Sequence, residues 1–247
     1  MAFHLSRTLH PYAKTVSKLG YPVTIHGHSS GSNTEGSSIF EILDLHFSSD
    51  LANHICKNTF VTALSALDEK PAVIVETGSS AWGSNSSQLF DRYVHEFGGE
   101  FFTVDVRMQP MLQLRKILGP ASTAVCDDSV RFLHRWYQEH GAKSVDFVYL
   151  DSWDLELIDP LPAAIHGLRE FLAVRPCLRD GSIVLIDDTP LDLSYFKKDD
   201  VDLARDFILQ TGMLPGKGSL VLKLLADDPK FEVLSHEYQI VYRYHEE

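Results

Sequence analysis

Residues 72–97 read AVIVETGSSAWGSNSSQLFDRYVHEF, and this stretch decides the fold. A short apolar run ends at Glu76 and is followed by a turn of glycine, serine and asparagine. In the segment after the turn, the apolar residues fall on one face of a helix: Leu89, Phe90, Tyr93, Val94 and Phe97. The pattern predicts a buried strand, a glycine-containing turn and a helix, in that order.

The same alternation of apolar runs and amphipathic stretches continues to Ile186. Further strands are expected at EFFTVDV (100–106), TAVC (123–126), VDFVYLD (145–151) and GSIVLIDD (181–188). The helices expected between them cover residues 108–118, 127–140 and 163–174. Alternation of this kind is typical of βαβ units around a parallel sheet.

After Ile186 we expect a helix at 201–212 and two strands, SLVLKLL (219–225) and FEVLSHEYQIVYRY (231–244). Only residues 226–230 separate these strands, too few for a parallel crossover, so they are expected to pair antiparallel. The chain is therefore predicted to have a Rossmann-like α/β fold. Its seven-stranded sheet is expected to be mostly parallel with the last strand antiparallel, and helices are expected on both faces.

Residues 1–69 lack the regular alternation and contain a Gly/Ser-rich stretch, HGHSSGSNTEGSS. We expect them to form an extension of the same domain, with helices between Ile39 and Leu67, that acts as a lid over the site. Residues 70–247 then form the Rossmann-like domain itself.

The chain has 247 residues, a formal net charge of −12 and no long run of Lys or Arg, which argues against a nucleic-acid partner. No apolar stretch approaches the roughly 20 residues that span a bilayer, and the N-terminus lacks the apolar core of a secretory signal. We therefore expect a cytoplasmic protein without a membrane partner. Three widely spaced cysteines predict neither a disulfide framework nor a zinc site. The oligomeric state is open, and a homodimer is compatible with the sequence.

Acidic residues directly follow the apolar runs: Glu76, Asp105, Asp151, Asp187 and Asp188. In an open parallel sheet, ligands bind outside the carboxyl ends of the strands, so these residues predict a site at one rim. The first turn lacks G-x-G-x-x-G, which argues against a nicotinamide dehydrogenase. A carboxylate before that turn suits a cationic amino-acid group better than a pyrophosphate. Asp105 is spaced to meet ribose hydroxyls, with a strand-end cap as the alternative.

Five motifs in this order resemble the successive motifs of class I S-adenosylmethionine-dependent methyltransferases: VIVETGSSAWGSN, FFTVDV, CDDSVRFL, VDFVYLDSWD and GSIVLIDD. Within that class they are most similar to the branch of small-molecule O-methyltransferases that contains catechol O-methyltransferase. The likeness covers roughly residues 70–190. It implies S-adenosylmethionine as the cofactor and a small molecule as the methyl acceptor.

The resemblance places the methionine part of the cofactor at the glycine turn, the ribose at Asp105 and the adenine beside Asp128 and Ser129. Trp153 is positioned to stack on a planar ligand, with core packing as the alternative. The full set of expected cofactor-binding residues is Glu76, Gly78, Ser79, Ser80, Gly83, Ser84, Asp105, Asp128, Ser129, Asp151 and Trp153.

In the catechol branch, an aspartate after the fourth strand and an acidic-amide pair after the fifth bind a divalent metal. Asp151, Asp187 and Asp188 occupy the matching positions, so the resemblance implies that they are the catalytic and metal-binding residues. Three carboxylates on one rim repel one another unless a cation or raised pKa values intervene. Oxygen ligands favour Mg²⁺, with Ca²⁺ and Mn²⁺ as alternatives.

The sequence departs from that branch at two positions. Asp188 stands where the branch has asparagine, and Asp154 stands where it has the lysine that acts as base. Two rival hypotheses therefore remain: a metal-independent methyltransferase with a histidine base such as His26 or His28, and a non-catalytic nucleotide-binding domain on the same fold. Lys217, between two glycines, either reaches the site or marks only a tight turn.

Overall fold

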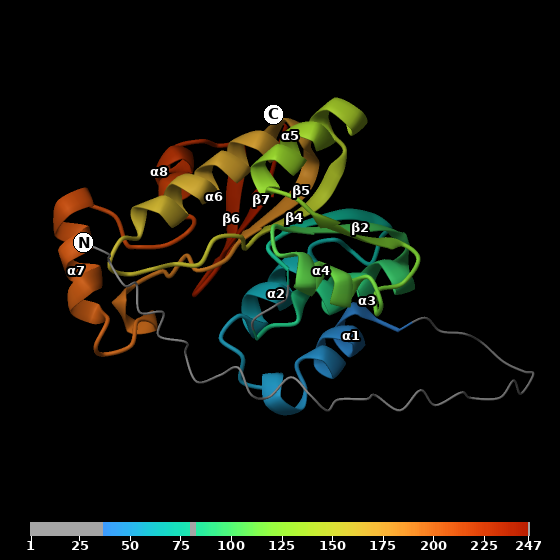
Figure 1. Cartoon of the computed structure of the whole chain (residues 1–247), viewed down its shortest axis with the longest axis horizontal. Helices are drawn as coiled ribbons and strands as arrows, with labels where there is room; N and C mark the ends of the chain where they lie inside the picture. Colours follow the sequence, from blue (N-terminus) through green and yellow to red (C-terminus); the bar gives the residue numbers. More distant parts are fainter. Residues whose placement is uncertain (1–36, 80–82, 247) are drawn as a thin grey trace, which may run out of the picture. The chain divides into compact units, whose positions relative to one another are not determined.

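The computed structural model describes residues 37–79 and 83–246 (Figure 1). Within these residues seven strands form one sheet in the order β3-β2-β1-β4-β5-β7-β6. The strands are β1 (Ala72–Thr77), β2 (Gly99–Asp105), β3 (Ser122–Cys126), β4 (Val145–Leu150), β5 (Leu178–Ile186), β6 (Phe231–His236) and β7 (Ile240–Tyr244). Strands β1 to β5 pair in parallel, and β7 pairs antiparallel with both β5 and β6. The predicted fold class is confirmed.

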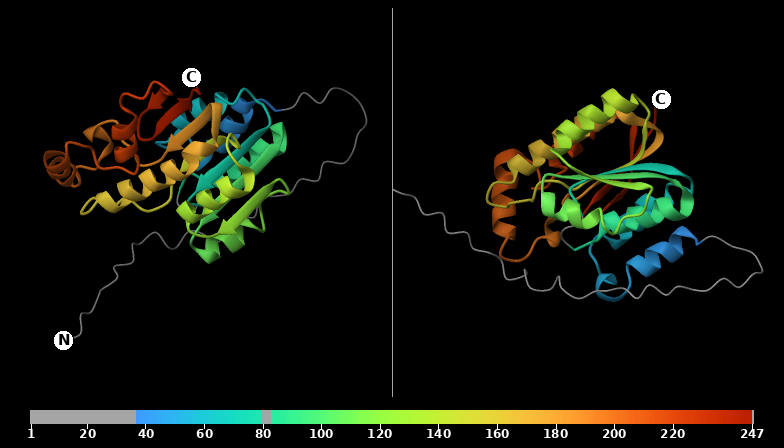
Figure 2. Two further views of the ribbon diagram at one scale, coloured as in Figure 1. Left: turned by 90° about the horizontal axis from the view of Figure 1, so that it is seen from above. Right: turned by 45° about the vertical axis from the view of Figure 1, so that its right-hand side comes forward.

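Helices cover both faces of the sheet (Figures 1 and 2). Their bounds are α1 (Ile39–His46), α2 (Lys57–Ser65), α3 (Ser86–Phe97), α4 (Met108–Leu114), α5 (Ser129–His140), α6 (Leu161–Val174), α7 (Val201–Thr211) and α8 (Ser219–Leu225). Within the same residues, short 3-10 turns occur at Ser49–Leu51, Arg175–Cys177 and Leu193–Tyr195. No helix in the described part of the chain is long and apolar enough to cross a membrane.

The pleat of the strands divides the apolar residues between two cores. On one face, Ile74 of β1 and Phe147 of β4 pack with Phe60 of α2 and Phe90 of α3. On the other face, the next residues along these strands, Val75 and Val148, pack with α5, α6 and α8. Because successive side chains of β1 and β4 are both buried, these strands read as continuous apolar runs in the sequence.

Helices α1 and α2 lie within the region expected to be helical, between Ile39 and Leu67. Their buried side chains, including Ile42, Leu43 and Phe60, belong to the core on the α3 face of the sheet. Residues 1–36, with His26 and His28, lie outside the described residues. The lid role expected for the extension therefore stays a prediction.

Two of the strand predictions are wrong. Residues 219–225 form helix α8, in which Val221 and Leu225 are buried one helical turn apart. The single long strand expected at 231–244 is a hairpin of β6 and β7. A short run of seven residues as apolar as SLVLKLL does not distinguish helix from strand by its periodicity, and here packing of α8 in the same core as α6 decides.

The turn of this hairpin lies beside the end of β5. Tyr238 accepts a hydrogen bond from the backbone N–H of Thr189 at 2.9 Å, and Glu237 accepts one from that of Leu191 at 2.7 Å, both through their carbonyl oxygens. The hairpin therefore carries its turn residues to the carboxyl edge of the parallel strands.

Helix α6 approaches the chain before α8 so closely that only glycine fits at the contact. A Cβ added to Gly167 of α6 would lie 2.3 Å from the carbonyl oxygen of Lys217. The same backbone of Lys217 donates a hydrogen bond to the carbonyl of Asp188 at 2.9 Å. Gly167 thus fixes the distance between α6 and the segment that carries Lys217.

We expect Gly167→Ala to lower the free energy of unfolding by about 2 kcal/mol, because the added methyl forces α6 away from a fixed backbone. Alanine is otherwise the better helix former, so propensity alone predicts the opposite sign. Urea unfolding measures the difference. Gly119→Ala is the matched control, since its Cβ would meet only the carboxylate of Asp91 at 3.3 Å. Equal stability of both variants would contradict the close approach.

Candidate functional site

A cavity of about 400 Å³ opens at the carboxyl ends of the parallel strands. Each of β1, β2, β3, β4 and β5 contributes the residues that directly follow it, and α6 and the turn before α8 add His166 and Lys217. The lining residues are Gly78, Ser79, Val104, Asp105, Val106, Arg107, Asp127, Asp128, Ser129, Asp151, Ser152, Trp153, Asp154, His166, Asp187, Asp188 and Lys217. The carboxyl edge of the sheet, where the sequence predicts a site, therefore forms a wall of this cavity.

Most of the expected cofactor-binding residues line this cavity, and three described ones do not. Glu76, Gly83 and Ser84 lie outside its lining, and Ser80 lies outside the described residues. Gly78 is held against β4, since its φ is +77° and an added Cβ would lie 2.5 Å from the carbonyl oxygen of Asp151. This contact brings the first turn and the end of β4 to the same wall.

The carboxylate of Asp105 is held by several donors. It accepts hydrogen bonds from the backbone N–H and the hydroxyl of Ser79, each at 3.0 Å, and from the backbone N–H of Arg107 at 2.7 Å. The guanidinium of Arg107 also pairs with it, with Nε 2.9 Å from Oδ1. Burial raises the pKa of Asp105, but the hydrogen bonds from Arg107 and Ser79 outweigh it, so the pKa is lowered. Asp105 is therefore ionised at neutral pH.

The opposite end of the cavity is formed by the start of α5 and the residues after β4. Asp128 is the N-cap of α5 and accepts a hydrogen bond from the backbone N–H of Arg131 at 2.9 Å. Ser129 Oγ lies 3.0 Å from Nε2 of His166. The rings of His166 and Trp153 have centroids 5.2 Å apart. Trp153 is 56% exposed, so the core-packing alternative for this residue is wrong.

Glu76 faces inward. Its side chain is fully buried and accepts hydrogen bonds from the hydroxyls of Ser86 and Ser87, each at 2.5 Å, in the first turn of α3. Burial raises the pKa of Glu76 to about 7, against the opposing effect of these hydrogen bonds. The carboxylate ties the end of β1 to the N-terminus of α3, where negative charge is favoured.

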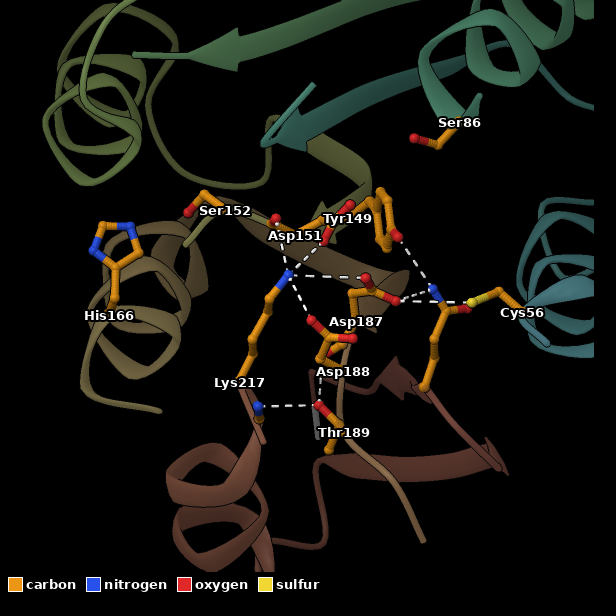
Figure 3. A network of polar contacts seen from close by, with 12 residues as sticks. Cys56, Ser86, Tyr149, Asp151, Ser152, His166, Asp187, Asp188, Thr189 and Lys217 are labelled. Atoms are coloured by element: carbon orange, nitrogen blue, oxygen red, sulfur yellow. Dashed lines mark hydrogen bonds and ion pairs between the residues drawn. The ribbon is translucent and has the colours of Figure 1, made fainter. Parts of the chain in front are cut away.

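The three aspartates after β4 and β5 converge on Lys217 (Figure 3). Its Nζ lies 2.6 Å from Oδ1 of Asp151, 3.0 Å from Oδ2 of Asp188 and 3.8 Å from Oδ2 of Asp187. It also donates to the carbonyl oxygen of Asp151 at 3.1 Å. The residue is 4% exposed. The sequence left open whether Lys217 reaches the site or only marks a tight turn. The structure confirms that it reaches the site.

Asp187 and Asp188 are also held from the side of the hairpin. Gln239 donates to Oδ1 of Asp187 at 2.6 Å, and the Tyr238 hydroxyl donates to Oδ1 of Asp188 at 2.5 Å. The Cys56 thiol lies 3.9 Å from the Asp187 carboxylate. The sequence offered no local signal for these partners, because they come from segments 50 or more positions away from the carboxylates.

The charges of this cluster differ from residue to residue. Burial raises the pKa of Asp151, and the neighbouring charge of Asp187 raises it further. Burial also acts to raise the pKa of Asp187, but the ammonium of Lys217 and hydrogen bonds from Asp151 and Gln239 lower it overall. Burial and the charge of Asp187 raise the pKa of Asp188. Asp187 is thus the most readily ionised of the three, with Lys217 as its counter-ion.

The three aspartates were expected to hold a divalent metal, and their surroundings do not fit one. Nζ of Lys217 occupies the point at which their oxygens converge, and Mg²⁺ needs oxygens at about 2.0–2.1 Å in an octahedron. Within residues 37–79 and 83–246, no group of three or more His, Cys, Asp or Glu side chains is arranged to hold a metal ion. The predicted metal is not confirmed.

No protein-family model matches the sequence, and no curated protein matches it. Among solved structures, the chain is similar to the methyltransferase MycE of the mycinamycin biosynthetic pathway, in complex with Mg and SAH (S-adenosylhomocysteine), at 14% identity and a TM-score of 0.58. The match covers 85% of this chain and 55% of that one, so this chain spans about half the length of MycE. The chain has the class I methyltransferase fold.

Two further solved methyltransferases match over most of both chains, with lower TM-scores. An O-methyltransferase from Bacillus cereus in complex with SAH matches at 14% identity and a TM-score of 0.47, covering 83% of this chain and 90% of that one. An SAH-bound methyltransferase from Podospora anserina matches at 14% identity and 0.48, covering 87% and 91%. The expected likeness to the catechol branch is not confirmed.

In this fold the buried Glu76 makes stability depend on pH. Its folded-state pKa of about 7 lies above the ordinary value of 4.5, so the folded state binds a proton that the unfolded state has lost between these pH values. Stability is therefore expected to fall as pH rises through this window, by about 3 kcal/mol for this group.

Glu76→Gln should remove this part of the pH dependence, because an amide stays neutral. Urea unfolding at pH 4.5 and at pH 8 measures the difference for the wild-type protein and the variant. Glu139→Gln, at an exposed position of α5, is the control and should leave the pH dependence unchanged. A Glu76→Gln protein that loses as much stability over this window as wild type would contradict the assignment.

Proposed function

We propose that this protein binds S-adenosylmethionine in the cavity and transfers its methyl group to an oxygen of a small-molecule acceptor. The observation that carries the proposal is the Asp105 carboxylate, which is ionised and faces the cavity at the end of β2. An acidic side chain at this place is suited to accept hydrogen bonds from the ribose hydroxyls of a bound nucleoside. The SAH bound to MycE, which has the same fold, supports the same ligand class.

The proposed cofactor extends across the cavity from Trp153 to Gly78. The exposed indole of Trp153 offers a face on which an adenine ring can stack, beside Asp128 and Ser129. Asp105 holds the ribose, and because the Arg107 side chain is the more exposed of its partners, it is the one that the ribose displaces. The methionine part of the cofactor then lies along Gly78, where the glycine has no side chain to cover the backbone.

The acceptor is proposed to lie against Asp151, Asp187 and Asp188, which keep 14–21% of their side chains exposed and line the cavity. A carboxylate of this cluster accepts the proton of the acceptor hydroxyl while the oxygen attacks the sulfonium methyl. The carbon–sulfur bond breaks, and the neutral sulfur of S-adenosylhomocysteine takes the electron pair. Holding acceptor and cofactor in line supplies much of the rate enhancement of such a transfer.

The acceptor end of the cavity is lined by more acidic groups than basic ones. Three aspartates stand against the single ammonium of Lys217. An uncharged hydroxyl compound is therefore favoured over a carboxylate or phosphate ester, which the cluster would repel. Transfer of label from methyl-labelled S-adenosylmethionine to neutral hydroxyl compounds, with acidic analogues in parallel, tests this preference.

Asp105→Asn should weaken binding of S-adenosylhomocysteine about 10-fold or more, because the amide cannot accept as strongly from two ribose hydroxyls. Calorimetric titration measures the dissociation constant. Asp199→Asn, an exposed carboxylate outside the cavity lining, is the matched control and should bind as wild type does. Unchanged affinity in Asp105→Asn would remove the ribose assignment, and no binding by the wild-type protein would remove the proposed function.

A further inference from the structure

We propose that Lys217 is a built-in cation that takes the place of a divalent metal at the Asp151–Asp187–Asp188 cluster, so that the site works without a metal ion. Lys217 acts here as a positioning residue: it gathers and partly neutralises the carboxylates, and the carboxylates face the acceptor. The role in catalysis rests on the proposed function, whereas the exclusion of metal can be tested without it.

The first support is that the ammonium group is fully engaged. Its three N–H bonds are matched by three close oxygens, namely Oδ1 of Asp151 at 2.6 Å, Oδ2 of Asp188 at 3.0 Å and the carbonyl of Asp151 at 3.1 Å. Distances of this length suit an ammonium, whereas Mg²⁺ binds oxygen at about 2.0–2.1 Å and Ca²⁺ at 2.3–2.6 Å. A metal ion could use these oxygens only after Lys217 had left them.

The second support is that the backbone holds Lys217 in place. A Cβ at Gly216 would lie 2.6 Å from the carbonyl oxygen of Asp188, and one at Gly218 would lie 2.5 Å from Oγ1 of Thr189. Thr189 Oγ1 also accepts a hydrogen bond from the N–H of Gly218 at 3.0 Å (Figure 3). Together with Gly167 on α6, these contacts leave the lysine backbone no room to withdraw.

The third support comes from the outer oxygens of the cluster. Oδ1 of Asp187 is satisfied by Gln239, and Oδ1 of Asp188 by Tyr238. The carboxylates are therefore oriented by neutral donors on one side and by the ammonium on the other. A buried cluster of like charges is stable only when paired in this way, so the lysine belongs to the built structure of the site.

The test is binding of Mn²⁺ to the chelator-treated protein, followed by electron paramagnetic resonance. Wild type should bind no Mn²⁺ at this site at millimolar ion. Lys217→Met should gain a site with a dissociation constant at least about 10-fold below that concentration, because the three carboxylates lose the ammonium that pairs with them. Adding Asp187→Ala to Lys217→Met should abolish the gained site, because the variant lacks one of the ligand carboxylates. Lys223→Met, an exposed lysine on α8, is the matched control and should behave as wild type.

Two outcomes would overturn the proposal. The first is Mn²⁺ binding by wild type that is lost in Asp187→Ala, and it can be observed even if Lys217→Met does not fold. The second is a folded Lys217→Met, with the circular dichroism spectrum of wild type, that gains no Mn²⁺ site. In the activity assay, wild type should be insensitive to EDTA, whereas methyl transfer by Lys217→Met should depend on added Mn²⁺.

Titration with S-adenosylhomocysteine in parallel keeps the two proposals apart. Binding of the nucleoside without Mn²⁺ binding supports both. Mn²⁺ binding together with nucleoside binding overturns the built-in cation and leaves the proposed function standing. Binding of neither overturns the proposed function and supports the exclusion of metal.

Discussion

The contact between the Lys217 ammonium and the carboxylates of Asp151 and Asp188 is the interaction on which the site depends. It joins the end of β4, the end of β5 and the turn before α8, which are far apart in the sequence. Carboxylates buried at the end of two adjacent strands would repel each other and open this edge of the sheet. The lysine makes a compact rim possible, and the glycines around it let three backbones approach one another closely enough to form the contact.

Much of the fold was predictable because the relevant signals are local. Strand β1 follows from its apolar run, and α3 follows from the helical period of its apolar residues. Four of the five strand-end carboxylates, all except Glu76, lie on one rim as expected, because parallel strands end at the same edge. Where the pattern was short, as in residues 219–225, periodicity could not separate a helix from a strand, and tertiary packing decided.

The rest of the site could not be predicted, since it depends on contacts between distant segments. Lys217 is 66 positions from Asp151, and Tyr238 reaches Asp188 only because the hairpin turns beside β5. The sequence analysis expected a cation or raised pKa values among the three carboxylates, and the structure has a cation there. That cation is the ammonium of Lys217. The acidic residues of the sequence do not indicate which basic residue pairs with them. The inward orientation of Glu76 could not be predicted either. The sequence shows Ser86 and Ser87, but it does not show that their hydroxyls point at this carboxylate.

The hairpin contacts also mark where the chain after β5 is held against the rest of the molecule. The chain after β5 is fixed at Thr189 and Leu191 by the turn of the hairpin, and it is fixed again at Gly216 and Gly218 by close backbone contacts. The intervening residues, 192–215, are anchored at both ends. Insertions or replacements there can therefore be accommodated without moving the carboxylates or the lysine. A segment held in this way, with helix α7 inside it, can change in length or composition while the rim of carboxylates stays intact.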